Sequence, residues 1–221
     1  MTDTQTSQTG EGSAAQDGSG PSEAPAYDAK AVLHRYVKSA SGALVWKLEG
    51  LDEYDVRRPL TATGLNLLGV VKHVAGVSAE YFGAVFDRPF PEPLPWYAEG
   101  AEENADFWAT PDESREYITG LYHRAWEHAD ATIEALDLDA TGHVSWWPAE
   151  RNPVTLHQIL VHMLAELNRH AGHADILREQ LDHKAGLNQR NSNLPDHDEA
   201  WWTEYLERVE AAAKEASGQG E

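Results

Sequence analysis

Histidine and glutamate side chains recur at helical spacing in the segment LVHMLAELNRHAGHADILREQ, residues 160–180. Glu166 and His170 are four residues apart, His162 precedes the glutamate by four, and His173 follows His170 by three. Residues four apart on a helix lie on the same face, one turn above the other. Neutral imidazole and carboxylate are a common ligand set for zinc and similar divalent ions, so this spacing predicts that Glu166 and His170 bind one ion.

The Glu166 and His170 pair also faces the predicted core. At about 100° per residue, both side chains project into the apolar arc of this helix, whereas His162 and His173 lie at its edge. The residues that define the arc are Leu156, Ile159, Leu160, Met163, Leu167, Ala174 and Leu181. A buried ionised carboxylate is costly without a partner, so Glu166 needs a cation or a proton. The structural alternative to a metal is an interior histidine hydrogen-bonded to this glutamate.

A second helix supplies a third ligand of the right type. In NLLGVVKHVAGVSAEYFG, residues 66–83, apolar side chains form one face, and Gly69, Gly76 and Gly83 repeat every seventh residue on nearly the opposite face. His73 lies between these faces on a helix that should be buried nearly all round, so it is an interior imidazole. The glycines favour either close helix packing or close approach of a ligand. We predict that His73, Glu166 and His170 converge on one ion.

Four long helices are expected to position these residues. An apolar stripe from Leu33 to Leu51 predicts the first, which ends near EGLDEYD, and Asn66 is a good N-cap for the second, which continues to about Phe86. Thr110, with Pro111 and the capping-box residue Glu113, predicts the start of the third. The fourth follows a cap at Asn152 or Thr155 and ends near Leu181.

A fifth amphipathic helix is predicted in DEAWWTEYLERVEAAAKEA, with Trp201, Trp202, Tyr205, Leu206 and Val209 as its packing side. Strand signals are almost absent; HVSWW alternates briefly but is too short to build a sheet. The expected fold is therefore all-α: a four-helix bundle with an additional C-terminal helix, in one domain at 26–217. Residues 1–25 contain Gly, Ser, Thr and acidic residues but no large apolar side chain beyond Met1, which predicts a disordered acidic tail.

Composition narrows the function. The formal net charge is -20, with 17 basic against 37 acidic residues, which argues against nucleic acid or an anionic membrane as partner. The sequence contains no cysteine, so any thiol chemistry needs a thiol from a small molecule. It also contains neither a secretory signal pattern nor an apolar run of about 20 residues, which favours a cytoplasmic protein.

The segments LLGVVKHVAGVSAEYFG and NPVTLHQILVHMLAELNRHAGHADILREQLD resemble the DinB-like superfamily. The resemblance covers about residues 28–210 and is strongest to the actinobacterial branch related to the mini-circle protein. It implies a four-helix bundle with a divalent metal bound by His73, Glu166 and His170. Glu166 resembles the ligand set of the mycothiol-dependent maleylpyruvate isomerases. His173 takes the place of a glutamine in the HRGQ motif of other members, so His173, like His162, is either a supporting partner or an extra ligand.

Superfamily members of known activity mostly use a low-molecular-weight thiol such as mycothiol, and the resemblance implies a metal that lowers the pKa of this thiol. The preferred hypothesis is a metal-dependent enzyme that transfers such a thiol to an electrophile or isomerises an adduct. A metal-dependent hydrolase and a non-catalytic metal-binding bundle, acting as a homodimer, are the alternatives. Zinc is the favoured ion, and nickel, iron and manganese also suit these ligands.

Two pairs of residues could contact the substrate. Arg57 and Arg58 suit an anionic group, and the indoles of Trp146 and Trp147 suit a sugar-bearing thiol. Both pairs also have a structural explanation. The arginines follow the C-terminus of the first helix, where cations are favoured, and the tryptophans can cover the end of the bundle.

Overall fold

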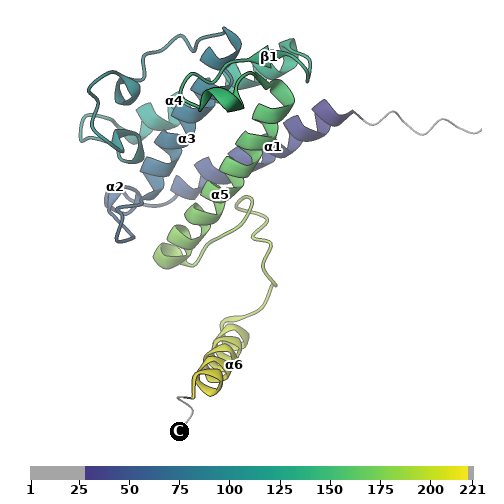
Figure 1. Cartoon of the computed structure of the whole chain (residues 1–221). Helices are drawn as coiled ribbons and strands as arrows, with labels where there is room; N and C mark the ends of the chain where they lie inside the picture. Colours follow the sequence, from purple (N-terminus) through teal and green to yellow (C-terminus); the bar gives the residue numbers. More distant parts are fainter. Residues whose placement is uncertain (1–27, 219–221) are drawn as a thin grey trace, which may run out of the picture.

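Four long helices form the bundle in the computed structural model, which describes residues 28–218 (Figure 1). They are α1 (Ala29–Val45), α3 (Leu67–Tyr81), α4 (Arg115–Ala135) and α5 (Leu156–Asp182). Helix α3 packs against α4 and α5, and α1 packs against α5. The all-α class and the bundle are confirmed, whereas the predicted tail at 1–25 lies outside the described residues.

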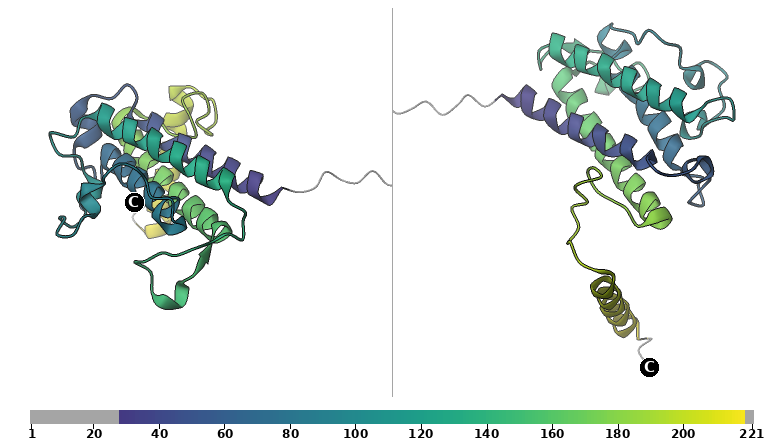
Figure 2. Two further views of the ribbon diagram at one scale, coloured as in Figure 1. Left: turned by 90° about the horizontal axis from the view of Figure 1, so that it is seen from above. Right: turned by 180° about the vertical axis from the view of Figure 1, so that it is seen from behind.

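Short elements connect the long helices. They are the helix α2 (Glu53–Arg57), five 3-10 turns at Trp46–Leu48, Ala84–Phe86, Pro95–Tyr97, Ala105–Phe107 and Ala149–Arg151, and the strands β1 (Thr141–Gly142) and β2 (Val154–Thr155). The two strands pair antiparallel, with Thr141 opposite Thr155. HVSWW is not part of either strand. In the connection between α3 and α4, two of the 3-10 turns lie beside α3, on the outside of the bundle (Figure 2).

Helix α3 is the most deeply buried helix, as its apolar and glycine-rich surface predicts. Val70, Val74 and Ala75 are fully covered, and even Lys72 is only 2% exposed. Helices α1 and α4 are tied by a hydrogen bond from the Tyr122 hydroxyl to the Ser41 carbonyl, 2.7 Å long. The bundle therefore holds α3 rigidly beside α5, and this pair of helices carries the predicted ligands.

The helix starts were predicted more accurately than the ends. Asn66 caps α3 and Thr155 caps α5, each by accepting a hydrogen bond from a backbone N–H of the first turn. Asn152 instead bonds the N–H and carbonyl of Val144 in the preceding loop. The prediction for α4 was wrong: its cap is Ser114, and the Glu113 carboxylate accepts a hydrogen bond from the Thr110 N–H inside a turn before the helix.

Two helix ends were predicted too late. Helix α1 ends at Val45, and the apolar stripe continues through a 3-10 turn that buries Leu48 before Gly50, with φ of +74°, turns the chain. Helix α3 ends at Tyr81 because Gly83 leaves helical geometry. At Gly83, a Cβ would lie 3.2 Å from backbone atoms of Arg88 and Phe90, so the chain turns back tightly there. In both cases the apolar spacing continues after the helix has ended.

The C-terminal helix forms as predicted but does not pack as predicted. Helix α6 (Glu199–Ser217) starts at the cap Asp198 and lies apart from the bundle (Figure 1). It contains no buried residue, and Leu206 and Val209 of its apolar side are 61% and 50% exposed. Helical periodicity records an apolar face but does not specify a partner for it. Within residues 28–218, no helix is both long and apolar enough to cross a membrane.

Candidate metal centre

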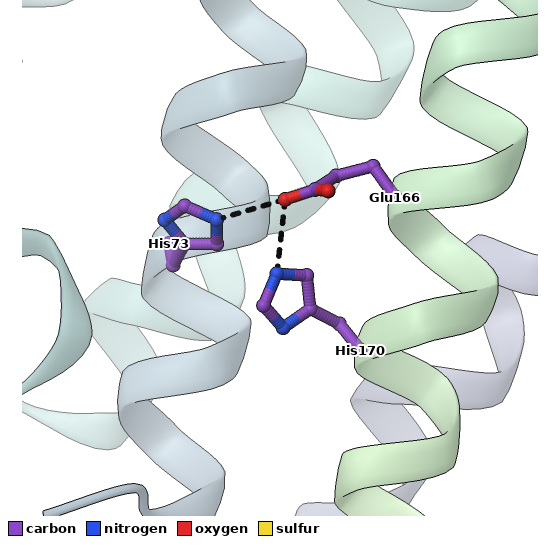
Figure 3. Close-up of side chains that lie close together, drawn as sticks. All are labelled: His73, Glu166 and His170. Atoms are coloured by element: carbon purple, nitrogen blue, oxygen red, sulfur yellow. Dashed lines mark hydrogen bonds and ion pairs between the residues drawn. The ribbon is translucent and has the colours of Figure 1, made fainter. Parts of the chain in front are cut away.

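Side chains from α3 and α5 meet where the two helices lie side by side (Figure 3). Glu166 Oε1 is 3.3 Å from His73 Nε2 and 3.0 Å from His170 Nε2. One ligand-type atom from each residue lies within 4.8 Å of those from the other two. The helical spacing thus brings Glu166 and His170 together, and helix packing brings His73 to them from 93 residues away in the chain.

The two imidazoles compensate the charge of the Glu166 carboxylate. Their hydrogen bonds, above all that from His170, hold the pKa of Glu166 far below its usual range despite burial. Burial by itself would lower the pKa of His73, but the carboxylates of Asp106 and Glu166 outweigh this effect and raise it. While the His73 ring is charged, a proton on Nε2 of each imidazole stabilises the cluster. A divalent cation between these atoms would replace those protons, so the donor set fits such an ion.

The second nitrogen of His73 is also bound. Nδ1 lies 2.6 Å from Asp106 Oδ2, and the ring stacks on Phe107 with centroids 4.0 Å apart and planes 19° apart. Asp106 and Phe107 belong to the 3-10 turn at Ala105–Phe107, between α3 and α4. Metal-binding histidines commonly donate their second N–H to a carboxylate, which fixes the ring and its tautomer. This contact leaves Nε2 of His73 directed at Glu166.

The glycine line of α3 explains how this turn comes so close. A Cβ on Gly69 would lie 1.8 Å from the Phe107 carbonyl oxygen, and a Cβ on Gly76 would lie 2.7 Å from the Tyr97 hydroxyl. Real Cβ atoms do not approach other atoms so closely, so Gly69 must be glycine unless the backbone of the turn moves, whereas at Gly76 a movement of the Tyr97 side chain could make room. The glycines therefore serve packing, which was one of the two interpretations, and the residue that packs against Gly69 is Phe107, which lines the cavity.

A cavity of about 570 Å³ opens beside the cluster. Its lining comprises Thr61, Thr63, Leu65, His73, Phe107, Glu166, Arg169, His170 and His173. His173 thus lies at the site without joining the three-residue ligand cluster, and its ring centroid is 5.4 Å from that of His170. Burial lowers the pKa of His173, which favours a neutral imidazole. Nδ1 of His170 and Nδ1 of His173 are buried without a hydrogen-bond partner among the described residues.

The remaining predicted site residues lie outside this lining. His162 packs against the rings of Tyr81 and Trp147, at 4.7 and 5.1 Å between centroids. The indole N–H groups of Trp146 and Trp147 both point to the Tyr81 hydroxyl, at 3.4 and 3.1 Å. These aromatic rings form a separate cluster.

The two arginines are held by neighbouring protein groups. Arg57 donates to the carbonyls of Thr110 and Glu113 and to the Glu53 carboxylate, and Arg58 pairs with Asp55. Arg57 therefore anchors the segment before α4. The structure brings neither arginine to the cavity.

Sequence reasoning missed Asp106, Phe107, Thr61, Thr63 and Arg169. The first four lie in connections without helical periodicity, so their place relative to His73 depends on the tertiary fold. Arg169 could have been predicted from the sequence. It directly precedes His170 and lies on the exposed edge of the same helix, so it borders the mouth of the site. It forms no ion pair or hydrogen bond within residues 28–218.

Together the fold and the site define a helical-bundle protein of the DinB-like superfamily with a His–Glu–His cluster able to hold a divalent ion. The family model described as Mycothiol-S-transferase matches residues 32–183, which run from α1 to just beyond α5. The chain therefore belongs to the mycothiol-S-transferase family. No curated protein matches the sequence. The matched region contains the whole ligand cluster and excludes α6.

Proposed function

We propose that this protein is a divalent-metal-dependent transferase that joins a mycothiol-like thiol to an electrophilic small molecule. The observation that carries the proposal is the convergence of His73, Glu166 and His170 at one point of a cavity, in a chain that belongs to the mycothiol-S-transferase family. Zinc is the ion that we expect, because two imidazoles and one carboxylate are typical of its catalytic sites.

Each residue of the cluster has a defined task in this proposal. His73 and His170 direct Nε2 at the site, and Glu166 contributes the negative charge between them. A divalent ion held by these groups would lower the pKa of a bound thiol, so that thiolate is present near neutral pH. Thr61, Thr63 and Arg169 offer hydroxyl and guanidinium donors to the polar parts of the thiol or the electrophile.

The nucleophile must come from outside the chain, because the sequence contains no cysteine. In the transfer, the thiol releases its proton to solvent and its sulfur forms a bond with an electrophilic carbon. With a haloalkyl acceptor, the halide leaves with the bonding electron pair, so the reaction needs neither oxidant nor reductant. Isomerisation of an adduct would use the same site but release the thiol again.

Conjugation of monochlorobimane with mycothiol tests this proposal. Purified protein should accelerate formation of the fluorescent adduct after zinc reconstitution and lose this rate after chelation. Glu166→Gln keeps the shape of the side chain but removes its charge, so zinc affinity should fall by more than about 100-fold, since changes to residues that only support a ligand already cost about 10–100-fold. The conjugation rate should fall to the uncatalysed level.

Glu179→Gln is the matched control, because Glu179 is an exposed glutamate of the same helix α5. It should bind zinc and conjugate bimane as the unaltered protein does. Zinc binding without any metal-dependent conjugation by mycothiol, bacillithiol or glutathione would reject the transferase proposal. Turnover of ester or amide probes without thiol would then favour the hydrolase.

A further inference from the structure

The 3-10 turn beside His73 is fixed to α3 by three residues at successive steps of three. Asn66 donates from Nδ2 to the Phe107 carbonyl at 3.1 Å, and Gly69 leaves the space that this carbonyl occupies. Lys72 donates from Nζ to the carbonyls of Ala105 and Trp108, at 2.8 and 2.9 Å. These contacts bracket residues 106 and 107 on both sides. We call Asn66, Gly69 and Lys72 the α3 clamp.

The clamp contains a charged residue that is buried, Lys72. Lys72 is 2% exposed and also pairs with the Glu113 carboxylate at 2.8 Å. Its ammonium therefore donates to two backbone carbonyls and one carboxylate, which uses its full donor capacity. A buried lysine with three partners at fixed positions resists displacement, because moving the turn would leave the charge without hydrogen bonds. The hydrogen bonds of Lys72 therefore fix the turn to α3.

The clamped turn presents two side chains to His73. Phe107 stacks on the imidazole, which restricts its rotation, and the Asp106 carboxylate reaches Nδ1. The two carboxylates around His73 compete for a single proton when the ring is neutral. Asp106, at 2.6 Å, is closer than Glu166, at 3.3 Å, so the proton belongs on Nδ1.

We propose that Asp106 is a positioning residue that holds His73 in the Nδ1–H tautomer, and that the α3 clamp keeps this carboxylate in place. When the ring is neutral, Nε2 of His73 then carries no proton and is free to bind a cation. His170 differs, because its Nε2 donates to Glu166 and its Nδ1 has no partner among the described residues. The effect on zinc rests on the proposed function, whereas the tautomer does not.

Nitrogen NMR of the metal-free protein tests the tautomer directly. With ¹⁵N-labelled histidine at alkaline pH, where the rings are neutral, long-range proton–nitrogen spectra distinguish Nδ1–H from Nε2–H. His73 should be Nδ1–H in the unaltered protein and in Asp112→Asn, a control at an exposed aspartate of the same connection. In Asp106→Ala, the ring should change to Nε2–H and donate to Glu166. An Nε2–H ring in the unaltered protein would overturn the proposal.

Zinc affinity, measured by competition with a chromophoric chelator, supplies a second test. Asp106→Ala should weaken zinc binding by about 10–100-fold. Asp106→Asn keeps an acceptor oxygen without the charge and should recover part of this loss, and Asp112→Asn should match the unaltered protein. Equal affinities in all four proteins would reject the role of Asp106.

Folding and function are separated by two further comparisons. Circular dichroism should show unchanged helix content in each variant. If Asp106→Ala unfolds, zinc affinity is compared between the unaltered protein and the nearly isosteric Asp106→Asn. The tautomer of His73 is then read from the NMR spectrum of the unaltered protein alone. If the unaltered protein binds no zinc, the proposed function fails. The NMR experiment then still confirms or rejects the role of Asp106.

Discussion

Two helices line the candidate site, and we call their lining side chains the α3 wall and the α5 wall. The two walls differ in how many of their buried polar atoms have hydrogen-bond partners. On the α3 wall, both nitrogens of His73 have carboxylate partners and the ring lies against Phe107. On the α5 wall, Nδ1 of His170 and Nδ1 of His173 are buried and have no hydrogen-bond partner among residues 28–218. Buried polar atoms without partners are rare in native proteins and usually mark a functional position. Both His73 nitrogens of the α3 wall therefore have partners, whereas two buried nitrogens of the α5 wall have none among the described residues.

This difference assigns different tasks to the two helices. A fully bonded wall costs little reorganisation when a ligand binds, because its side chains already hold the binding geometry. The incomplete wall borders the cavity together with Arg169. Under the proposed function, polar groups of an incoming thiol or electrophile would form hydrogen bonds with those nitrogens, and this gain in free energy would appear only on binding. The α3 wall therefore holds His73 in a fixed geometry, whereas the two unpartnered nitrogens of the α5 wall remain available to an incoming molecule.

A pair of glycine substitutions should sharpen the comparison most strongly. Gly69→Ala puts a methyl group 1.8 Å from the Phe107 carbonyl, so the clamped turn must move, and we expect a loss of about 1–3 kcal/mol in the free energy of unfolding. Gly172→Ala on α5 meets nothing within 4 Å and should stabilise the helix by about 0.5–1 kcal/mol. Urea denaturation measures both changes. Equal effects would contradict the tight packing of the clamped turn against Gly69.

The pH dependence of stability should come from His73 and from the two carboxylates that contact it, Asp106 and Glu166. The pKa of His73 is raised in the folded state, so its contribution is complete below about pH 6.5 and is lost as the pH rises through the folded-state value. The pKa values of Asp106 and Glu166 are lowered, so their contributions are present above about pH 4.5 and are lost as the pH falls through their folded-state values. These three groups should therefore stabilise the metal-free protein most between about pH 4.5 and 6.5.

Melting temperatures of metal-free protein and His73→Gln measure this effect. Their difference should be greatest near pH 6 and narrow by roughly 2–4 °C towards pH 9. Zinc competes with protons for the imidazoles, so the stabilisation by added zinc should instead increase with pH. A constant difference between the two proteins across this range would exclude His73 as the titrating group.

The two walls also differ in how far the sequence predicts them. The α5 wall follows from spacing alone, because Glu166 and His170 are one turn apart and face the apolar arc. His73 was predictable because its helix is apolar on nearly all sides. Asp106 and Phe107 were not, because their position depends on a tight approach of a non-helical connection to Gly69, and no local pattern specifies such an approach. The glycine repeat indicated that something packs there, but not which residues.

The same limit explains the residues that were assigned to the substrate. Arg57 and Arg58 have the chemistry of anion binding, but Arg57 donates to two carbonyls and a carboxylate of the fold, and Arg58 pairs with Asp55 away from the cavity. Residue type predicts what a side chain can bind, whereas only the tertiary structure shows whether another part of the chain binds it first. Arg57 and Arg169 are both arginines, but within the described residues other parts of the chain bind only Arg57.

His173 provides the smallest and most specific test of the comparison. Its ring lies near His170 in the cavity lining, but it is not one of the three clustered ligands. Because it supports no ligand through a hydrogen bond, His173→Gln should leave zinc affinity within about threefold, far less than the change expected for Asp106→Ala. The KM for thiol or electrophile should rise by under tenfold, since one hydrogen bond to a neutral partner is worth about 0.5–1.5 kcal/mol. A loss of zinc as large as that in Asp106→Ala would mean that His173 supports the ion as Asp106 does, and its assignment to substrate recognition would be wrong.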